Sequence, residues 1–288
     1  MNRPSGAGTV CLVLVPLLLG SAALLGCDDA ASTASEPDQG PQDAEVVPCE
    51  ALFGQPTQST GLDPDACAPA CECGEVPWAP PVYEQAWIDG LKGWTLANPP
   101  ESLASDPYAD ELSSPTASGS VCGARFDTDA ASYSLETYPS SADAAAVGAV
   151  VTHAGPCGLC SSLQNLAIYM GQPDLTDPVR ECGIQGLLGS AEDNIACLEA
   201  IGFDGPCAQI WYFNTNHTRE RCLDLCMAAL DSPHHTEDGS LNPCIQCDED
   251  ESGPVFKAVA GRTRRNSGLP SALCRPCDSV YPLEHVYP

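Results

Sequence analysis

Apolar side chains recur every three or four residues through much of the C-terminal half of the chain, which is the spacing of a helix that buries one face. In residues 161–170, for example, Leu163, Leu166 and Met170 fall on the same side, and Gly171 provides a natural helix end. The same spacing predicts further helices over residues 176–188, 190–201 and 207–230, and one that starts at residue 252 or 253.

Local signals support the predicted helix ends. Ser190 and Asp193 resemble a capping box, which satisfies free N–H groups at the start of a helix, and Gly202 fits the end of the same helix. Pro254 suits the first turn of the last helix, because the N–H that proline lacks is not needed there. A further amphipathic helix is expected from Val82 to Trp94.

Few strands are expected. Tyr133 to Tyr138 alternates as a short strand does, and Pro139 would end it. Residues 141–147 are rich in alanine and favour a helix, and residues 149–151 form either a second strand or the end of that helix. The expected fold is therefore mainly α with a few short strands, in a domain that spans residues 120–288.

The N-terminal residues have the features of a secretion signal. Arg3 precedes an apolar run from Val10 to Leu25, which is too short for a membrane-spanning helix. The run ends in Leu24-Leu25-Gly26-Cys27, which resembles the lipobox of bacterial lipoproteins. The resemblance implies that residues 1–26 are a signal peptide, and that a lipid on Cys27 anchors the mature chain to the cell envelope, on the periplasmic or outer surface.

Two segments separate this anchor from the helical domain. Residues 27–48 are acidic and polar, with too little apolar surface to fold, so a disordered linker is expected there. Residues 49–119 are rich in cysteine and proline, and we expect them to wrap around the main body.

The charge balance excludes one broad class of function. The 288 residues include 39 acidic and 11 basic side chains, for a formal net charge of −28. A general nucleic-acid binder is excluded, because a phosphate backbone must be met by clustered Lys and Arg. No phosphate-binding loop, nucleophile elbow or HExxH motif is present, and we expect no cofactor. The sequence does not indicate an oligomeric state.

Cysteine usage points to an oxidising compartment. Removing Cys11 with the signal and Cys27 with the lipid leaves 16 of the 18 cysteines, which predicts eight disulfides. Twelve of the 16 lie between Cys122 and Cys277, so six bridges are expected within the helical domain. Cys222 and Cys226 share one helical face and should reach different partners.

Two pairs of closely spaced cysteines leave an alternative open. A structural zinc site commonly takes four thiolate ligands from two such pairs. The cysteines concerned are Cys244, Cys247, Cys274 and Cys277. The gap between the pairs is longer than usual for a zinc site, so disulfides are the preferred interpretation and no metal is expected.

The most suggestive stretch for catalysis surrounds His153 and Cys160. Cys160 precedes a predicted helix, whose N-terminus stabilises a thiolate, and His153 is a candidate base for it. Residues 155–160 resemble the nucleophile region of papain-like proteases, but Ala154 replaces that family's oxyanion-hole Gln and the downstream His motif is missing, so that family is rejected. Thioredoxin-like chemistry would need a βαβ context that this chain lacks. A turn held by disulfides is the simpler interpretation, and a pocket without a free thiol, made of His153, Ser161, Ser162 and Gln164, is the remaining alternative.

A second feature is the grouping of basic residues near the C-terminus. Five of the 11 lie in one short stretch, namely Lys257, Arg262, Arg264, Arg265 and Arg275. We predict that Lys257, Arg262, Arg264 and Arg265 bind an anion through ammonium and guanidinium groups. Alternatively, the group neutralises the acidic run at residues 248–251, which lacks the ligand spacing of a calcium loop. Residues 214–221, with Trp211 and Tyr212, form either a cleft wall or a solvated helix face.

Two hypotheses follow for the function. In the first, the domain is a binding or structural module that contacts an anionic partner, and every cysteine is paired. In the second, it is an extracytoplasmic enzyme whose cleft combines His153, Cys160 and the arginines and acts on an anionic substrate. The two differ in geometry, because an enzyme must gather these residues in one concave site.

Overall fold

The computed structural model describes residues 52–65, 67, 71–73, 76–109 and 119–288. All of these residues belong to one compact unit. The predicted signal peptide, the lipidation site Cys27 and the linker at residues 27–48 lie outside the described residues.

The described part of the chain is rich in helices, as predicted. The α-helices are α1 (Gln85–Leu91), α2 (Ser141–Ala146), α3 (Leu163–Gly171), α4 (Thr176–Leu188), α5 (Ala191–Ile201), α6 (Gly205–Ala228), α7 (Pro243–Cys247) and α8 (Gly253–Ala260). A π-helical turn, η1 (Asp248–Ser252), joins α7 to α8. Two 3-10 turns follow, η2 (Arg265–Ser267) and η3 (Cys277–Ser279).

The helix ends follow the local signals. Ser190 accepts a hydrogen bond from the backbone of Asp193, and the Asp193 side chain accepts one from Ser190, so the predicted capping box is present. Gly202 ends α5 with a φ of 123°, which favours glycine. The helix expected from Val82 to Trp94 is shorter, spanning Gln85–Leu91.

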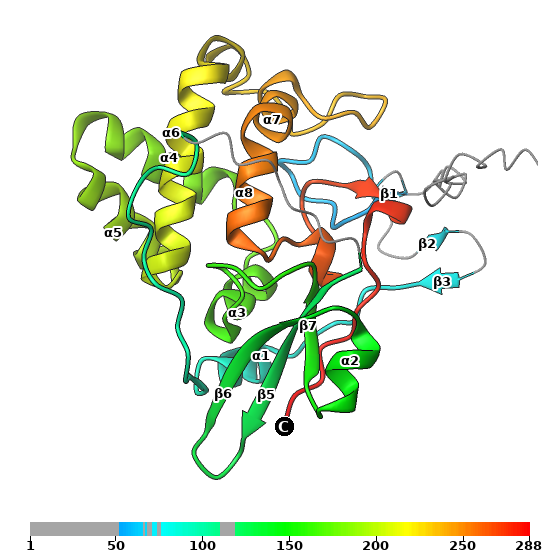
Figure 1. Ribbon diagram of the computed structural model, residues 1–288. Coiled ribbons are helices and arrows are strands. Elements are labelled where there is room, and N and C mark those ends of the chain that lie inside the picture. Colours follow the sequence, from blue (N-terminus) through cyan, green and yellow to red (C-terminus); the bar gives the residue numbers. More distant parts are fainter. Residues whose placement is uncertain (1–51, 66, 68–70, 74–75, 110–118) are drawn as a thin grey trace, which may run out of the picture. The chain divides into compact units, whose positions relative to one another are not determined.

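A four-stranded sheet covers one side of α3. Strands β5 (Val121–Asp127) and β6 (Ser132–Tyr138) form an antiparallel hairpin, β7 (Val150–Ala154) pairs antiparallel with β5, and β4 (Thr95–Leu96) pairs parallel with β6. Residues 149–151, for which a strand or a helix end was expected, therefore contribute to a strand. Figure 1 shows α3 between this sheet and helices α4, α6 and α8.

Four shorter strands form two further sheets of two strands each. Strand β1 (Leu52–Phe53) pairs with β8 (Arg275–Pro276), and β2 (Cys71–Cys73) pairs with β3 (Val76–Trp78), both antiparallel. Pairing of β1 with β8 brings the start of the described chain beside its C-terminal part.

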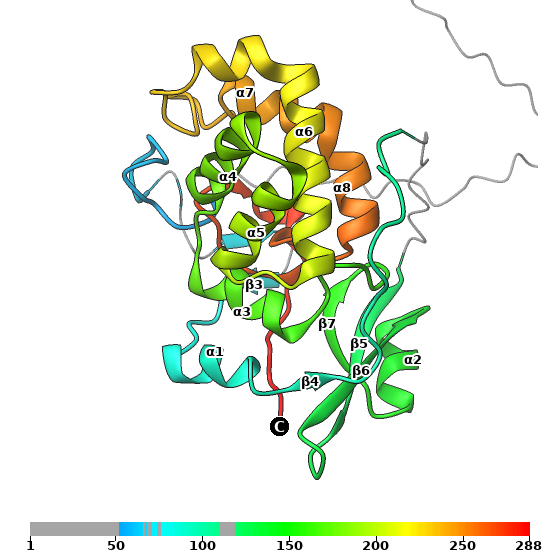
Figure 2. The same cartoon turned by 90° about the vertical axis from the view of Figure 1, so that its left-hand side faces the viewer.

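The main hydrophobic core lies where the helices meet the sheet. Its fully buried centre is formed by Leu163 and Leu166 of α3, Leu198 of α5 and Ile210 of α6. Ile88 and Leu91 of α1 join the same core, so this helix packs on the main body as expected. In Figure 2, α4 and α6 lie side by side, and α8 lies on the other side of α6.

Disulfides cross-link these layers. The described bridges are Cys67–Cys274, Cys122–Cys157, Cys160–Cys207, Cys182–Cys197, Cys222–Cys247 and Cys226–Cys244. Cys222 and Cys226 reach different partners, as predicted from their shared helical face. The expectation of six bridges within residues 122–277 is corrected, because Cys274 pairs instead with Cys67 in the preceding segment.

Candidate functional site

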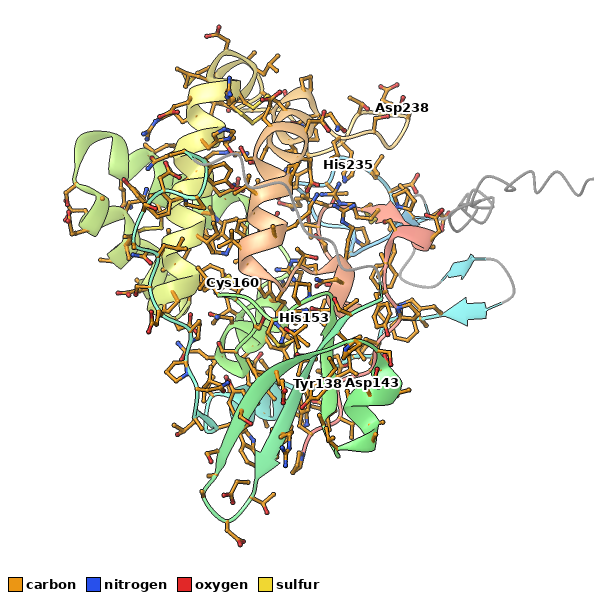
Figure 3. All side chains as sticks on the ribbon, viewed as in Figure 1. Tyr138, Asp143, His153, Cys160, His235 and Asp238 are labelled. Atoms are coloured by element: carbon orange, nitrogen blue, oxygen red, sulfur yellow. A yellow bond between two sulfur atoms is a disulfide. The ribbon has the colours of Figure 1, made fainter. Side chains whose placement is uncertain are left out.

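His153 of β7 is buried between the sheet and the helices (Figure 3), and Ser161, which it contacts, is buried as well. Its Nε2 lies 2.8 Å from the hydroxyl oxygen of Ser161, and its Nδ1 lies 2.9 Å from the Ala154 carbonyl oxygen. Burial, aided by the positive charge of Arg262, lowers the pKa of His153 well below its usual value. The neutral ring donates a hydrogen bond from Nδ1–H to the Ala154 carbonyl oxygen and accepts one at Nε2 from the Ser161 hydroxyl.

Arg262 belongs to the same buried cluster. Its guanidinium donates hydrogen bonds to the carbonyl oxygens of Thr152, Cys160 and Ser161 at 2.8, 3.2 and 2.9 Å, and to the Ser267 hydroxyl at 3.1 Å. Arg262 has no exposed surface. The prediction that Arg262 binds an external anion is therefore corrected, because its guanidinium donates to the interior of the protein and solvent does not reach it.

Two glycines allow this cluster to close. A Cβ on Gly158 would lie 2.4 Å from the Val259 carbonyl oxygen, and one on Gly261 would lie 2.4 Å from the Gly158 nitrogen. Because neither has a Cβ, the loop before α3 runs against the end of α8, and the N–H of Cys160 donates to the Ala260 carbonyl at 2.8 Å. Arg262 thus reaches the carbonyls of the loop.

The structure also corrects the assignment of Cys160 as a nucleophile. Its sulfur is bonded to Cys207 and has no exposed surface. A thiolate is the reactive form of cysteine, and a sulfur in a disulfide cannot supply one. His153, Cys160 and Arg262 do meet, as the enzyme hypothesis required, but they meet in the core rather than in a cleft.

The alternative zinc site is corrected for the same chemical reason. Cys244, Cys247 and Cys274 form disulfides with Cys226, Cys222 and Cys67. Cys277 is disulfide-bonded as well. Within the described ranges, no group of three or more His, Cys, Asp or Glu side chains is arranged to hold a metal ion.

Arg264 closes the C-terminal end of α3. Its guanidinium donates to the carbonyl oxygens of Tyr169 and Gln172 and lies 5.4 Å from the centre of the Tyr169 ring. These carbonyls belong to the last turn of the helix, where cations are favourable. Arg264 was predicted to bind an anion, but its guanidinium donates to backbone carbonyl oxygens of Tyr169, Gln172 and Pro270.

Three other cations surround a single carboxylate, and we refer to this group as the Glu249 cluster. Lys257 Nζ and an Arg265 guanidinium nitrogen each lie 3.0 Å from one oxygen of Glu249, and Arg275 lies 2.7 Å from the other. Burial alone would raise the pKa of the Glu249 carboxyl, but Arg275, Lys257 and Arg265 outweigh that effect and lower it. The cluster therefore carries a local excess of two positive charges.

The Glu249 cluster lies on the wall of a groove of about 580 Å³. The groove is lined by residues of α4, α6, α7, η1 and α8 and of the C-terminal segment, and most of its lining is apolar. Phe256 and Leu269 contribute from the core, and Ile184 and Met227 from the rim. Volumes of this size are typical of sites for small molecules.

The distribution of charge around the groove is opposite to that of the chain. In the described part of the chain, six basic and three acidic side chains line it, whereas the whole sequence holds 11 basic and 39 acidic residues. The basic residues are Arg180, Arg219, Lys257, Arg264, Arg265 and Arg275, and the acidic ones are Asp174, Asp248 and Glu249. A concave surface lined by one sign of charge concentrates ligands of the opposite sign.

A buried carboxyl group adjoins the cluster on η1. Asp248 accepts hydrogen bonds from the Thr218 hydroxyl and from Asn214 Nδ2, the latter at 3.2 Å. Burial raises the pKa of Asp248, which favours its neutral form. Because η1 is a single π-helical turn, it is a feature often found at functional sites.

Two hydrogen-bond donors in the groove lining lack partners. The Tyr169 hydroxyl and the Trp211 indole N–H are both buried, and neither forms a hydrogen bond of normal geometry with any described residue. Burial raises the pKa of Tyr169 to about 12, and the positive charge of Arg264 and the nearby Trp211 N–H act in the opposite direction. Unpaired buried donors of this kind are rare in folded proteins and call for an explanation.

Sequence reasoning found part of this site. Lys257 and Arg265, predicted to bind an anion, lie together, and so do Trp211 and Asn214 of the predicted cleft wall. Neutralisation of the acidic run also occurs, but at Glu249. The roles of Glu249 and Tyr169 were not predicted. The cations that share the Glu249 carboxylate lie between 8 and 26 positions after it in the sequence, and no local pattern marks such a contact.

Comparison with known proteins gives one match. Residues 191–283, which contain α5 to α8 and the Glu249 cluster, match the model of a family of unknown function (DUF8771). No curated protein and no solved structure matches the chain. In the part of the chain that the structure describes, no helix combines the length and the apolar character needed to cross a bilayer. The many disulfides are typical of an oxidising, extracytoplasmic location.

Proposed function

We propose that this protein is an extracytoplasmic binding module that takes an anionic small molecule in the groove beside Glu249. The observation that carries the proposal is the charge segregation, in which six of 11 basic residues line one groove of a chain whose net charge is −28. Scattered surface cations would instead be interspersed with the far more numerous acidic residues.

The Glu249 cluster offers the contacts that such an anion needs. The side chains of Lys257 and Arg265 are 39% and 31% exposed, so both can reach a ligand. Both point at one carboxylate together with Arg275, so three positive charges face one negative charge, and an incoming anion can share these cations with Glu249. Hydrogen bonds to charged groups contribute about 1.5–3 kcal/mol each, which is enough to orient a small ligand.

The test uses the fluorescent anion 8-anilinonaphthalene-1-sulfonate with the oxidised domain. We expect saturable binding that weakens as salt is added, because ions screen the cations. The double variant Lys257→Gln/Arg265→Gln should lower the affinity by about tenfold or more. Circular dichroism of both proteins checks that the fold is retained.

A matched control removes two cations elsewhere. Lys92 and Arg125 are exposed and lie outside the groove. Lys92→Gln/Arg125→Gln changes the net charge by the same amount and should leave the affinity unchanged. Equal loss of binding in both double variants would attribute the effect to net charge and would refute a site at the Glu249 cluster.

We also propose that the module is tethered to the cell envelope by a lipid on Cys27. The lipobox-like sequence before this residue supports the proposal. Expressed with its own leader in a bacterium, the wild-type chain should partition into detergent and carry a diacylglyceryl mass, and Cys27→Ser should do neither. Cys11→Ser, within the leader, is the matched control and should be lipidated normally. Lipidation of Cys27→Ser, or none in wild type, would refute the anchor.

A further inference from the structure

We infer that the ligand of the groove is a single-chain anionic amphiphile, with its headgroup at the Glu249 cluster and its hydrocarbon chain along the apolar rim formed by α4 and the end of α6. This inference rests on the proposed anion site and adds the chemical class of the ligand. It follows from the apolar rim and from the continuity of the rim with the Glu249 cluster.

The apolar rim is a concentrated patch of exposed hydrophobic side chains. Ile184 is 50% exposed, and Leu223, Met227 and Leu230 are 48%, 59% and 44% exposed. These four residues make up half of the large hydrophobic side chains that are exposed in the described part of the chain, and all four line the groove. Patches of this kind mark surfaces that contact another molecule.

The helix geometry explains why the patch is continuous. Leu223 and Met227 are four residues apart and share one face at the C-terminal end of α6, and Leu230 follows in the turn just after the helix. Ile184 stands opposite them, on α4. A hydrocarbon chain laid between these residues would remove apolar surface from water on both sides.

The rim and the Glu249 cluster belong to the same groove. Phe256 and Ile245 line the stretch that also holds Glu249 and Lys257. A ligand that is only anionic would leave the rim uncovered, and a ligand that is only apolar would leave the cationic excess unmet. An amphiphile with one charged end satisfies both, and a groove of about 580 Å³ is within the size range of sites for such molecules.

The experiment measures how affinity depends on chain length. Alkanesulfonates of four, six, eight and ten carbons, kept below their micelle concentrations, compete with 8-anilinonaphthalene-1-sulfonate on the oxidised domain. Sulfonates stay ionised at all working pH values, so only the chain changes. Each methylene that enters an apolar environment should increase affinity about fourfold, which gives about 200-fold between butanesulfonate and octanesulfonate.

Two variants separate head from chain. Leu223→Ser/Met227→Ser should flatten the dependence on chain length and leave the affinity for butanesulfonate unchanged. Both side chains are about half exposed, so the fold should tolerate the changes. Lys257→Gln/Arg265→Gln should weaken all four sulfonates by the same factor. Val82→Ser/Val147→Ser, which removes two exposed valines outside the groove, is the matched control.

The outcomes distinguish the two proposals. If butanesulfonate and octanesulfonate compete equally well, the anion site stands and the amphiphile is refuted. If no sulfonate binds and the fluorescent anion is insensitive to Lys257→Gln/Arg265→Gln, the proposed function itself fails. Octanol that competes as well as octanesulfonate would overturn the headgroup assignment. Sedimentation with phosphatidylglycerol vesicles without binding of octanesulfonate would assign the rim to a bilayer and overturn the inference.

Discussion

Replacing Arg262 tests whether this buried side chain, which follows α8, stabilises the fold through its hydrogen bonds to β7 and to the loop before α3. In Arg262→Met, the carbonyl oxygens of Thr152, Cys160 and Ser161 lose their guanidinium donor. These oxygens belong to the backbone, so the substitution cannot remove them along with the charge. They remain buried, and each unsatisfied polar group costs about 1–3 kcal/mol.

The net effect is smaller than the sum of these costs. Removing a buried guanidinium also relieves its desolvation penalty, which is several kcal/mol for a buried ion. With three carbonyls exposed to an apolar environment and one penalty relieved, we expect a net loss of about 3 kcal/mol in the free energy of unfolding. Arg262→Lys should cost at least as much, because it keeps the buried charge and loses the planar fork that serves four acceptors.

Urea unfolding of the oxidised protein, followed by far-UV circular dichroism, measures this loss. Arg125→Met is the control, because Arg125 is exposed and its replacement should change stability by less than about 0.5 kcal/mol. A stability of Arg262→Met within about 0.5 kcal/mol of wild type would refute the reasoning. It would indicate that Arg262 faces solvent, as the sequence-based prediction of anion binding requires.

Three further predictions concern stability. Burial, together with the charge of Arg262, lowers the pKa of His285 to about 3. Because the pKa of the unfolded ring is near 6.5, the stability that comes from keeping His285 neutral is fully present above pH 6.5, and about 2 kcal/mol of it is lost by pH 5. Urea titrations at pH 7 and pH 5 should show that His285→Asn loses less stability than the wild type between the two pH values. Ser190→Ala removes the capping box and should cost about 1 kcal/mol, measured as a lower urea midpoint, whereas Ser190→Asn should cost less. Cys182→Ala/Cys197→Ala opens a loop of 15 residues and should lower the free energy of unfolding by about 3 kcal/mol; no change would show that this bridge does not restrict the unfolded chain.

Elements with local signals were predictable from the sequence. The capping box at Ser190, the glycine that ends α5 and the first-turn proline of α8 depend only on neighbouring residues. Strand β5 was not predicted, because its first four residues are all buried and show no alternation. Helix α7 spans five residues, too few for a periodic pattern to appear.

The site was predictable only in part, because burial is set by tertiary packing. Arg262 and Arg265 are three positions apart in the same basic stretch, yet one is enclosed by the loop before α3 and the other faces the groove. The partner of Cys160 lies 47 residues away, so its participation in a disulfide could not be read from spacing. The grouping of basic residues near the C-terminus was visible in the sequence. Only the fold shows that three of them share the carboxylate of Glu249.

The disulfides of α6 have a mechanical consequence for the groove. Two bridges, Cys222–Cys247 and Cys226–Cys244, tie α6 to α7 along one wall. The bridge of α4 runs instead to α5, and no described disulfide joins α4 to α6. The contact of α6 with α7 is therefore covalent, whereas α4 is held against α6 by noncovalent contacts and is the part that can yield. Ligands of different girth should be accommodated by small shifts of α4 against a fixed α6, so the charged end of the groove keeps its geometry while the rim adapts.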